Sequence, residues 1–235
     1  MAVQFKLTSD VVNDGVKILV HGPAGAGKTS LCATTGAPTL IISAESGLLS
    51  LRNHRIPVAE IKTIDDLYEV YAYVTQSADA AQFEWICLDS ISEIAEVVLN
   101  AAKKSAKDPR QAYGALAEQM TDLLRAFRDL PGRNVYFACK QERAKDENSG
   151  AMLYFPSMPG NNLKQGISYF FDEVFALRIE QDDEGSPVRW LQTNRDFNYE
   201  AKDRSGALAM FEPPNLGAIA AKIRAPQSTE QAPAA

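Results

Sequence analysis

A short stretch near the start of the chain combines glycines, a lysine and hydroxyls at a spacing suited to binding phosphates. It reads His21-Gly22-Pro23-Ala24-Gly25-Ala26-Gly27-Lys28-Thr29-Ser30 and fits the pattern G-x-x-x-x-G-K-[ST]. Glycines let successive backbone N–H groups converge on phosphate oxygens. Lys28 would bring positive charge to the β- and γ-phosphates, and the Thr29 hydroxyl would complete a Mg²⁺ shell. Residues 22–30, here called the phosphate loop, are therefore predicted to bind ATP with Mg²⁺.

The segments on either side of the phosphate loop predict the setting that such a loop requires. Residues 17–20 are typical of a short buried strand, and residues 29–35 of a helix that ends at Gly36. A helix N-terminus directed at the phosphates adds partial positive charge. A glycine-rich turn that matched the pattern by chance would lack this order of strand, loop and helix.

A later apolar segment ends in a carboxylate. Residues 83–88 predict a buried strand, and Asp89 and Ser90 follow it directly. At the tip of a strand beside the phosphate loop, Asp89 would hold the Mg²⁺ shell. Asp89 could also cap the helix predicted for residues 91–102. The two roles are compatible, and the phosphate loop favours the metal role.

The remaining segments alternate between strand and helix, as in one α/β domain. Strands are predicted at 38–43, 58–63, 134–139, 169–180 and 188–194, and helices at 64–77, 111–130 and 216–223. The last two strands would form a hairpin, and Thr63 would cap the helix that follows it. Residues 144–166 contain glycine and proline with little periodicity, so a long loop is expected there. Residues 1–15 would lead in as a short strand and turn, within a core of residues 1–224. A disordered tail is expected at 225–235.

Composition narrows the class of protein. With 46% hydrophobic and 23% charged residues, the chain can bury a full core. No apolar run approaches the roughly 20 residues that span a bilayer, so no membrane partner is expected. Cys32, Cys87 and Cys139 lie far apart in apolar segments and are predicted to be buried free thiols of a reducing cytoplasm. A net charge of −6 leaves only local patches to attract nucleic acid.

The ordered set of motifs resembles the RecA/RadA-like ATPases over about residues 16–212. It is most similar to the compact phage proteins of this type that act in single-strand annealing or recombination. The resemblance is carried by the phosphate loop and by residues 41–47, 88–93, 135–141, 171–174 and 201–204. It implies a RecA-like P-loop NTPase fold. That fold has a mostly parallel twisted sheet with helices on both faces and a C-terminal antiparallel hairpin.

The resemblance also assigns roles to single residues. Glu45 matches a catalytic glutamate that orients or deprotonates the attacking water, although a surface glutamate capping the next turn is an alternative. Gln141 matches a polar residue that senses the γ-phosphate, and Lys140 is the competing candidate. Spacing alone does not separate the two.

Two basic residues near the end of the chain match residues that the family presents to a neighbouring subunit's ATP. Lys202 and Arg204 would act there as an arginine finger does, by stabilising charge in the transition state. The alternative is an ordinary solvated strand end. The resemblance to this family implies a homo-oligomer, either a ring or a filament, with head-to-tail interfaces.

Single-stranded DNA is the partner that the resemblance implies. Family loops for DNA would lie near residues 103–113 and 142–165. Candidate contacts to phosphates and bases are Lys103, Lys104, Lys107, Arg110, Tyr113, Tyr154 and Phe155. A solvated lysine-rich helix end, with its aromatic rings packed in the core, is the competing interpretation.

Three functional classes remain after this comparison. The favoured one is an ATPase that assembles on single-stranded DNA and promotes annealing or homologous recombination. It would be phage-encoded, act in the bacterial host cytoplasm and have a single-strand-binding protein as a candidate helper. The others are a helicase-like motor or loader and a small-molecule or nucleotide kinase. A kinase usually needs an arginine-rich lid, whereas residues 142–165 contain a single arginine, Arg143.

Overall fold

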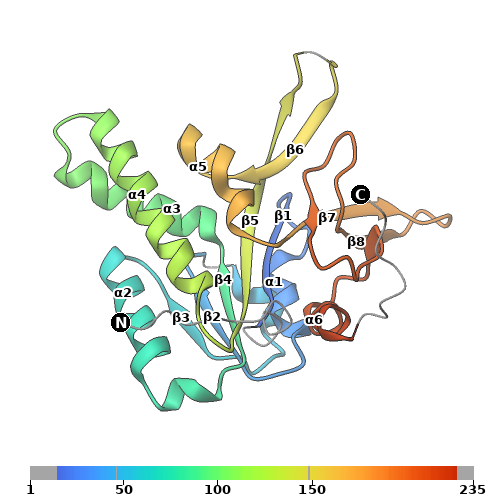
Figure 1. The fold of residues 1–235 in the computed structure, drawn as a ribbon, viewed down its shortest axis with the longest axis horizontal. Coiled ribbons are helices and arrows are strands. Elements are labelled where there is room, and N and C mark those ends of the chain that lie inside the picture. Colours follow the sequence, from blue (N-terminus) through green and yellow to red (C-terminus); the bar gives the residue numbers. More distant parts are fainter. Residues whose placement is uncertain (1–14, 46, 148, 227–235) are drawn as a thin grey trace.

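The fold is built on a single mixed β-sheet. The structure, a computed structural model, describes residues 15–45, 47–147 and 149–226. Six strands of the sheet are parallel, in the spatial order β3-β2-β4-β5-β1-β7 (Figure 1). Their bounds are β1 (Lys17–Gly22), β2 (Thr39–Ser43), β3 (Val58–Glu60), β4 (Trp85–Asp89), β5 (Asn134–Lys145) and β7 (Glu173–Gln181). Strands β2 and β4 are buried along their whole length, as expected for parallel strands covered on both faces.

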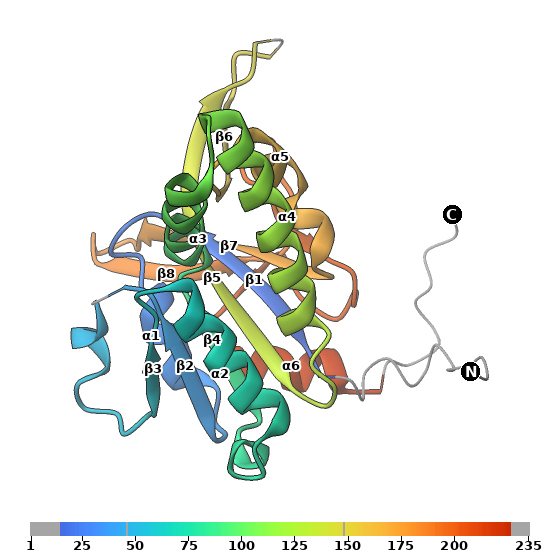
Figure 2. The same ribbon diagram turned by 90° about the vertical axis from the view of Figure 1, so that its left-hand side faces the viewer.

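The other four described strands join the sheet through antiparallel pairs. They are β6 (Met152–Ser157), β8 (Pro187–Gln192), β9 (Lys202–Asp203) and β10 (Phe211–Glu212). β8 and β9 both pair with β7, and β10 pairs with β8. β6 pairs with the outer part of β5, and this hairpin projects away from the body of the molecule (Figures 1 and 2).

Helices cover both faces of the sheet. One core cluster joins the sheet to α2 (Ile64–Gln76), α3 (Ile91–Ser105), α4 (Pro109–Arg128) and α5 (Asn161–Gly166). The other joins it to α1 (Lys28–Leu31) and α6 (Leu216–Arg224). Short 3₁₀ turns lie at η2 (Cys32–Thr34), η3 (Leu48–Leu51), η4 (Asp79–Gln82) and η5 (Ile167–Phe170). The predicted fold is therefore confirmed: a mostly parallel α/β sheet, helices on both faces and a C-terminal antiparallel hairpin.

Helix starts follow side-chain caps that the sequence encodes locally. The Thr63 hydroxyl accepts a hydrogen bond from the backbone N–H of Asp66, and the Asp66 carboxylate accepts one from the backbone N–H of Thr63, which confirms the predicted cap of α2. α3 is capped by Ser90, whose Oγ accepts from the Glu93 N–H, so the side chain of Asp89 is not the cap. All three cysteines are free and buried, as predicted.

Residues 144–166 do not form the long loop that the sequence suggested. β5 continues to Lys145, β6 pairs with it over six positions, and α5 follows. The outer part of β5 is polar on both faces because it extends beyond the covered sheet, so it lacks the apolar periodicity that marks a strand. Backbone pairing holds this hairpin, together with the contacts of the half-buried Tyr154 and Phe155 rings on β6.

Smaller corrections concern element ends. The helix after the phosphate loop is α-helical only to Leu31 and continues as a 3₁₀ turn. The strand expected from residue 169 begins at Glu173, after a 3₁₀ turn. The expected lead-in at 1–14 and most of the expected tail lie outside the described residues, and the core at 1–224 stays a prediction. No described helix is both long enough and apolar enough to cross a bilayer.

Candidate nucleotide-binding site

The phosphate loop lies between the end of β1 and the start of α1. Gly25 and Gly27 have φ angles of 75° and 106°, a region that side chains with a Cβ rarely adopt. The Lys28 ammonium donates to the carbonyl oxygens of Gly22 at 2.8 Å and Pro23 at 3.0 Å, so it lies across the loop. The Tyr136 hydroxyl, on β5, donates to the Lys28 carbonyl oxygen at 2.9 Å and so fixes the first turn of α1 against the sheet. The loop has the shape and charge to receive phosphates.

Lys28 shares the site with two carboxylates. Burial lowers the pKa of Lys28, while the charges of Glu45 and Asp89 act in the opposite direction. Both carboxylates therefore lie close enough to affect its titration. A pocket of about 700 Å³ is lined by Lys28, Thr29, Ser30 and Glu45. Its volume lies within the range of small-molecule and cofactor sites.

Asp89 and Thr29 meet the requirements of a Mg²⁺ shell. Asp89 is only 2% exposed, and its Oδ2 has no hydrogen-bond partner among the described residues. Burial raises the pKa of Asp89, and a hydrogen bond with the Thr29 hydroxyl lowers it. A buried carboxylate oxygen without a partner is costly unless a ligand or cation satisfies it. These two residues therefore fit a hydrated Mg²⁺ that takes its remaining ligands from phosphate and water.

Glu45 is held in place by the next strand. The Ser90 hydroxyl donates to Glu45 Oε1 at 2.5 Å, and the Ser43 hydroxyl donates to the Glu45 carbonyl oxygen at 2.6 Å. Its carboxylate thus lines the pocket with Lys28 rather than lying free on the surface. The geometry brings Glu45, Lys28, Thr29 and Asp89 to one edge of the sheet, where the parallel strands end. The catalytic role of Glu45 stays a prediction.

The two sensor candidates lie in different surroundings. The Lys140 ammonium forms an ion pair with Glu93 on α3, which raises the pKa of Lys140. The Gln141 side-chain amide instead lies 3.2 Å from Nδ1 of His21, the residue just before the phosphate loop. His21 is fully buried, and its Nε2 lies 2.7 Å from the Glu200 carbonyl oxygen. Burial lowers the pKa of His21. Gln141 is thus the candidate whose side chain contacts the residue before the phosphate loop, whereas Lys140 is paired in the sheet with Gly22. The choice between the two sensors stays a prediction.

Sequence reasoning missed two residues of the site, His21 and Arg189. A polar residue at the end of an apolar strand, directly before the first glycine, was the available signal for His21. Arg189 on β8 donates from Nε to the Ala26 carbonyl oxygen at 2.9 Å and lines the same pocket as Lys28. It lies 163 positions from its partner, so no local pattern could indicate it.

Lys202 and Arg204 do not reach the phosphate loop of their own chain. Lys202 pairs with Val174 on β7, which pairs with Leu19 in the first half of β1. The Lys202 ammonium donates to the Ser168 carbonyl oxygen at 2.8 Å, and Arg204 forms an exposed 2.8 Å ion pair with Asp172. Neither residue lines the pocket around Lys28. Their use in the neighbouring site stays a prediction.

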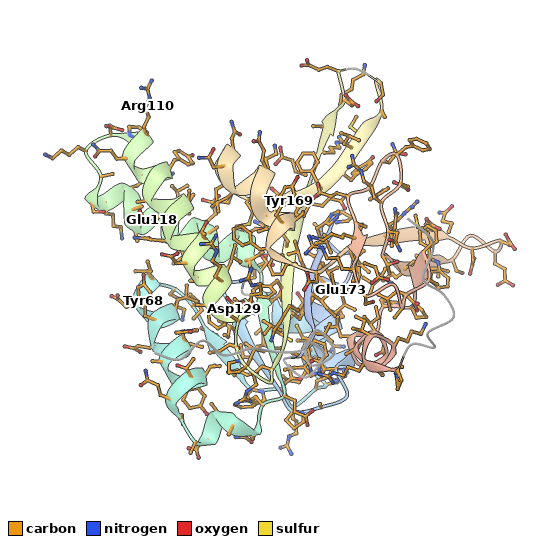
Figure 3. The ribbon with its side chains drawn as sticks, viewed as in Figure 1. Tyr68, Arg110, Glu118, Asp129, Tyr169 and Glu173 are labelled. Atoms are coloured by element: carbon orange, nitrogen blue, oxygen red, sulfur yellow. The ribbon has the colours of Figure 1, made fainter. Side chains whose placement is uncertain are left out.

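The basic candidates for DNA contact lie where α3 ends and α4 begins. Lys103, Lys104, Lys107 and Arg110 are all exposed, and Figure 3 shows Arg110 at the outer tip of α4. Beside them a groove of about 620 Å³ runs between α4 and α5, lined by Arg110, Tyr113, Gly160 and Asn161 among others. Tyr113 is 43% exposed. Lys103 and Lys104, in the last turn of α3, also stabilise that helix by interacting with its dipole. This matches the competing interpretation of a solvated lysine-rich helix end.

The two aromatic candidates of β6 already have intramolecular partners. The Tyr154 ring stacks on Tyr199 with centroids 4.6 Å apart, and the Lys164 ammonium lies 4.9 Å from the Phe155 ring centroid. Both residues are half-buried. A base would have to displace these contacts to stack on either ring, whereas Tyr113 is open. The assignment of all three to DNA stays a prediction.

Comparisons with known proteins identify a similar solved structure and a matching family. The solved structure of the RadB recombinase is similar to this chain, with a TM-score of 0.44 and 14% identity, over 78% of this chain and 83% of that one. A comparison with curated proteins found no match. A family model described as an AAA domain matches residues 14–205, which is most of the chain. The protein therefore belongs to this family of AAA domains.

Proposed function

We propose that this protein is a Mg²⁺-dependent ATPase that assembles on single-stranded DNA and promotes annealing or homologous recombination. The observation that carries the proposal is the edge of the sheet where Lys28, Thr29, Asp89 and Glu45 meet. A phosphate-binding loop, a buried carboxylate with an unsatisfied oxygen and a second carboxylate tied by Ser90 are the parts that hydrolysis of a nucleoside triphosphate needs.

Each residue of the site has a separate task. The loop N–H groups and Lys28 bind the phosphates, and Thr29 and Asp89 would hold Mg²⁺, which neutralises charge on the phosphate oxygens. Glu45 orients a water molecule and accepts its proton as the water oxygen attacks the γ-phosphorus, with ADP as the leaving group. The hydrogen bond from Ser90 fixes the Glu45 carboxylate, so its position does not depend on the bound nucleotide.

Coupling to DNA would pass through β5. Gln141 lies on that strand beside His21, and the same strand continues into the β5–β6 hairpin. A side chain that responds to the γ-phosphate would therefore act on the base of an outward-projecting hairpin. The exposed basic residues at the α3–α4 junction supply phosphate contacts, and Tyr113 supplies an open aromatic face.

Assembly would complete the active site. Lys202 and Arg204 lie away from their own phosphate loop, so a head-to-tail neighbour is the partner to which they could bring charge. We further propose action in the cytoplasm, on phage DNA, with a single-strand-binding protein as helper.

ATP turnover with and without single-stranded DNA tests this proposal. We expect hydrolysis that requires Mg²⁺, rises on addition of single-stranded DNA and disappears in Lys28→Ala protein. A fork-unwinding assay separates a helicase from an annealing protein, since only a helicase would open the duplex with ATP. Turnover equal in wild-type and Lys28→Ala protein would refute the proposal.

A further inference from the structure

Arg189 is fixed on the phosphate loop by a contact from the far end of the chain. Its Nε donates to the Ala26 carbonyl oxygen at 2.9 Å, and a Cβ placed on Gly27 would lie 3.6 Å from the same nitrogen. Both residues belong to the turn just before Lys28. Because β8 is paired with β7, and β7 with β1, the sheet itself holds the arginine at this distance.

The rest of the Arg189 guanidinium is not committed to another protein group. Within the described residues it forms no ion pair, and its one hydrogen bond uses only Nε. Arg178, on the neighbouring strand, is fully engaged by contrast. It pairs with Glu180 at 2.7 Å and stacks over the Tyr199 ring at 4.6 Å. A guanidinium has five N–H donors, so four remain on Arg189, in the forked arrangement that suits phosphate.

The sheet order determines which part of a nucleotide Arg189 would face. Glu45 and Asp89 approach the loop from β2 and β4, on one side of β1, whereas Arg189 approaches from β8 on the other side. The carboxylates mark the end of the pocket where the γ-phosphate and Mg²⁺ belong. Arg189 lies at the opposite flank, in a pocket that also includes Ser30, Thr34 and Pro214. With the γ-phosphate assigned to the carboxylate end, the phosphates left for this flank are those nearer the nucleoside.

We infer that Arg189 is a nucleotide-binding residue that acts on its own subunit's ligand. Its Nη groups hydrogen-bond to the α- and β-phosphate oxygens while Nε holds the Ala26 carbonyl. This inference rests on the proposed ATPase function and adds to it a second cation, supplied by the C-terminal hairpin. Since ATP and ADP share these phosphates, Arg189 contributes equally to the affinity for both. It differs in this from Lys202 and Arg204, which would act on a neighbour's γ-phosphate during turnover.

Calorimetric titration of ADP and ATP in the presence of Mg²⁺ tests the inference. Both nucleotides are titrated into wild type, Arg189→Gln and Arg189→Ala, each made in the Glu45→Gln background to suppress hydrolysis. Removing a charged hydrogen-bonding group of this kind raises a dissociation constant by about 10- to 100-fold. We expect that loss for ADP and ATP alike.

Two variants separate nucleotide contact from support of the loop. Arg189→Gln keeps an N–H donor for the Ala26 carbonyl but removes the charge, so it should unfold at the wild-type temperature and still lose affinity. Arg195→Ala, at another exposed arginine beyond β8 that lies outside the pocket, should bind both nucleotides as wild type does.

The outcomes are distinguishable. If wild type binds nucleotide and Arg189→Gln binds it equally tightly, Arg189 only supports the loop, and the inference is wrong while the ATPase proposal stands. A loss confined to ATP would also overturn it, because the contact would then be to the γ-phosphate. Absence of nucleotide binding by wild type would overturn both.

Discussion

Ser90 Oγ donates a hydrogen bond of 2.5 Å to Glu45 Oε1, which joins the ends of two adjacent strands. Ser43 on β2 is in register with Asp89 on β4, and the Ala44 N–H donates to the Asp89 carbonyl oxygen at 3.1 Å. The proposed base and the proposed metal ligand therefore emerge from neighbouring strands whose relative position is fixed by backbone pairing. The carboxylate of Glu45 gains its orientation from Ser90.

Glu45→Gln should separate nucleotide binding from hydrolysis. The amide is isosteric but cannot accept the proton of water, so we expect unchanged ATP affinity and a loss of about 10²- to 10⁴-fold in kcat. The ATP-bound form would persist, and the protein should stay longer on single-stranded DNA. Ser90→Ala should lower kcat by about tenfold by releasing the carboxylate, and Ser90→Thr, which keeps a hydroxyl, should restore it. Normal turnover in Glu45→Gln would move the base elsewhere, with Glu93 as the next candidate.

Lys28→Ala should abolish hydrolysis without unfolding the protein. Among the described residues, the Lys28 ammonium forms hydrogen bonds only with carbonyl oxygens of the loop, so we expect the core to tolerate its loss. Asp89→Ala should keep some nucleotide binding without Mg²⁺ and lose the increase that Mg²⁺ gives. ATP turnover, circular dichroism and titrations with and without EDTA measure these effects. A Lys28→Ala protein that loses its cooperative thermal transition would show that the loop is structural.

Binding to single-stranded DNA should weaken steeply with salt. Each phosphate contact contributes about −0.7 to the slope of log K against log[salt] for a single strand. Replacing Lys103, Lys104 and Lys107 together by Gln should therefore flatten the slope by up to about 2. Lys62→Gln is the matched control, because Lys62 is exposed but paired with Glu60 beside α2. An equal slope in the triple variant would place the DNA on another surface.

A shared active site predicts rescue on mixing. Arg204→Ala subunits keep an intact phosphate loop, and Lys28→Ala subunits keep an intact Arg204, so a mixed interface can unite the two intact parts. We expect each variant to be nearly inactive alone and the mixture to recover part of the wild-type rate. ATPase per subunit should also rise with protein concentration. Mixing Lys28→Ala with Glu45→Gln is the control, since both lesions affect the same site and should give no rescue. A flat rate across dilution, without rescue, would leave Lys202 and Arg204 as surface charges.

Glu173 should make the molecule less stable as the pH rises from 4.5 to 8. It is buried on β7 opposite Asp203 of β9, and its Oε2 has no hydrogen-bond partner among the described residues (Figure 3). Burial, and then the charge of Asp203, raise its pKa from 4.5 to about 8. The folded state therefore keeps a proton that the unfolded chain releases above pH 4.5. The free energy of unfolding should fall by about 1.4 kcal/mol per pH unit within that window and level off above pH 8.

Glu173→Gln provides the measurement for this pH dependence. The amide does not titrate, so the variant should lose the decline between pH 4.5 and 8 and be more stable than wild type at pH 8.5. Denaturant unfolding at several pH values compares the two proteins. Parallel pH curves would contradict the assignment to Glu173.

The parts of the site that the sequence predicted are those encoded by neighbouring residues. The phosphate loop, the strand ending at Asp89 and the Thr63 cap each depend on fewer than ten consecutive positions, so spacing alone revealed them. The β5–β6 hairpin was not predicted because the outer part of β5 is polar and is held by backbone pairing, so it shows no apolar periodicity. His21 and Arg189 escaped for a different reason. Their partners, Gln141 and Ala26, are 120 and 163 positions away, and only the closed sheet brings them together.

The protonation state of the buried His21 ring determines the direction of the hydrogen bonds around it. The Glu200 carbonyl can only accept, so Nε2 of His21 must carry the proton. Burial keeps the ring neutral, and Nδ1 therefore retains its lone pair. A lone pair on Nδ1 cannot donate to the Gln141 Oε1 that lies 3.2 Å away, so a neutral ring requires the Gln141 amide to turn its NH₂ group toward Nδ1. Gln141→Glu would reverse this order, since a carboxylate can only accept. The histidine would then take up a second proton. The negative charge of the introduced carboxylate would thus convert the neutral His21 ring, next to the phosphate loop, into an imidazolium.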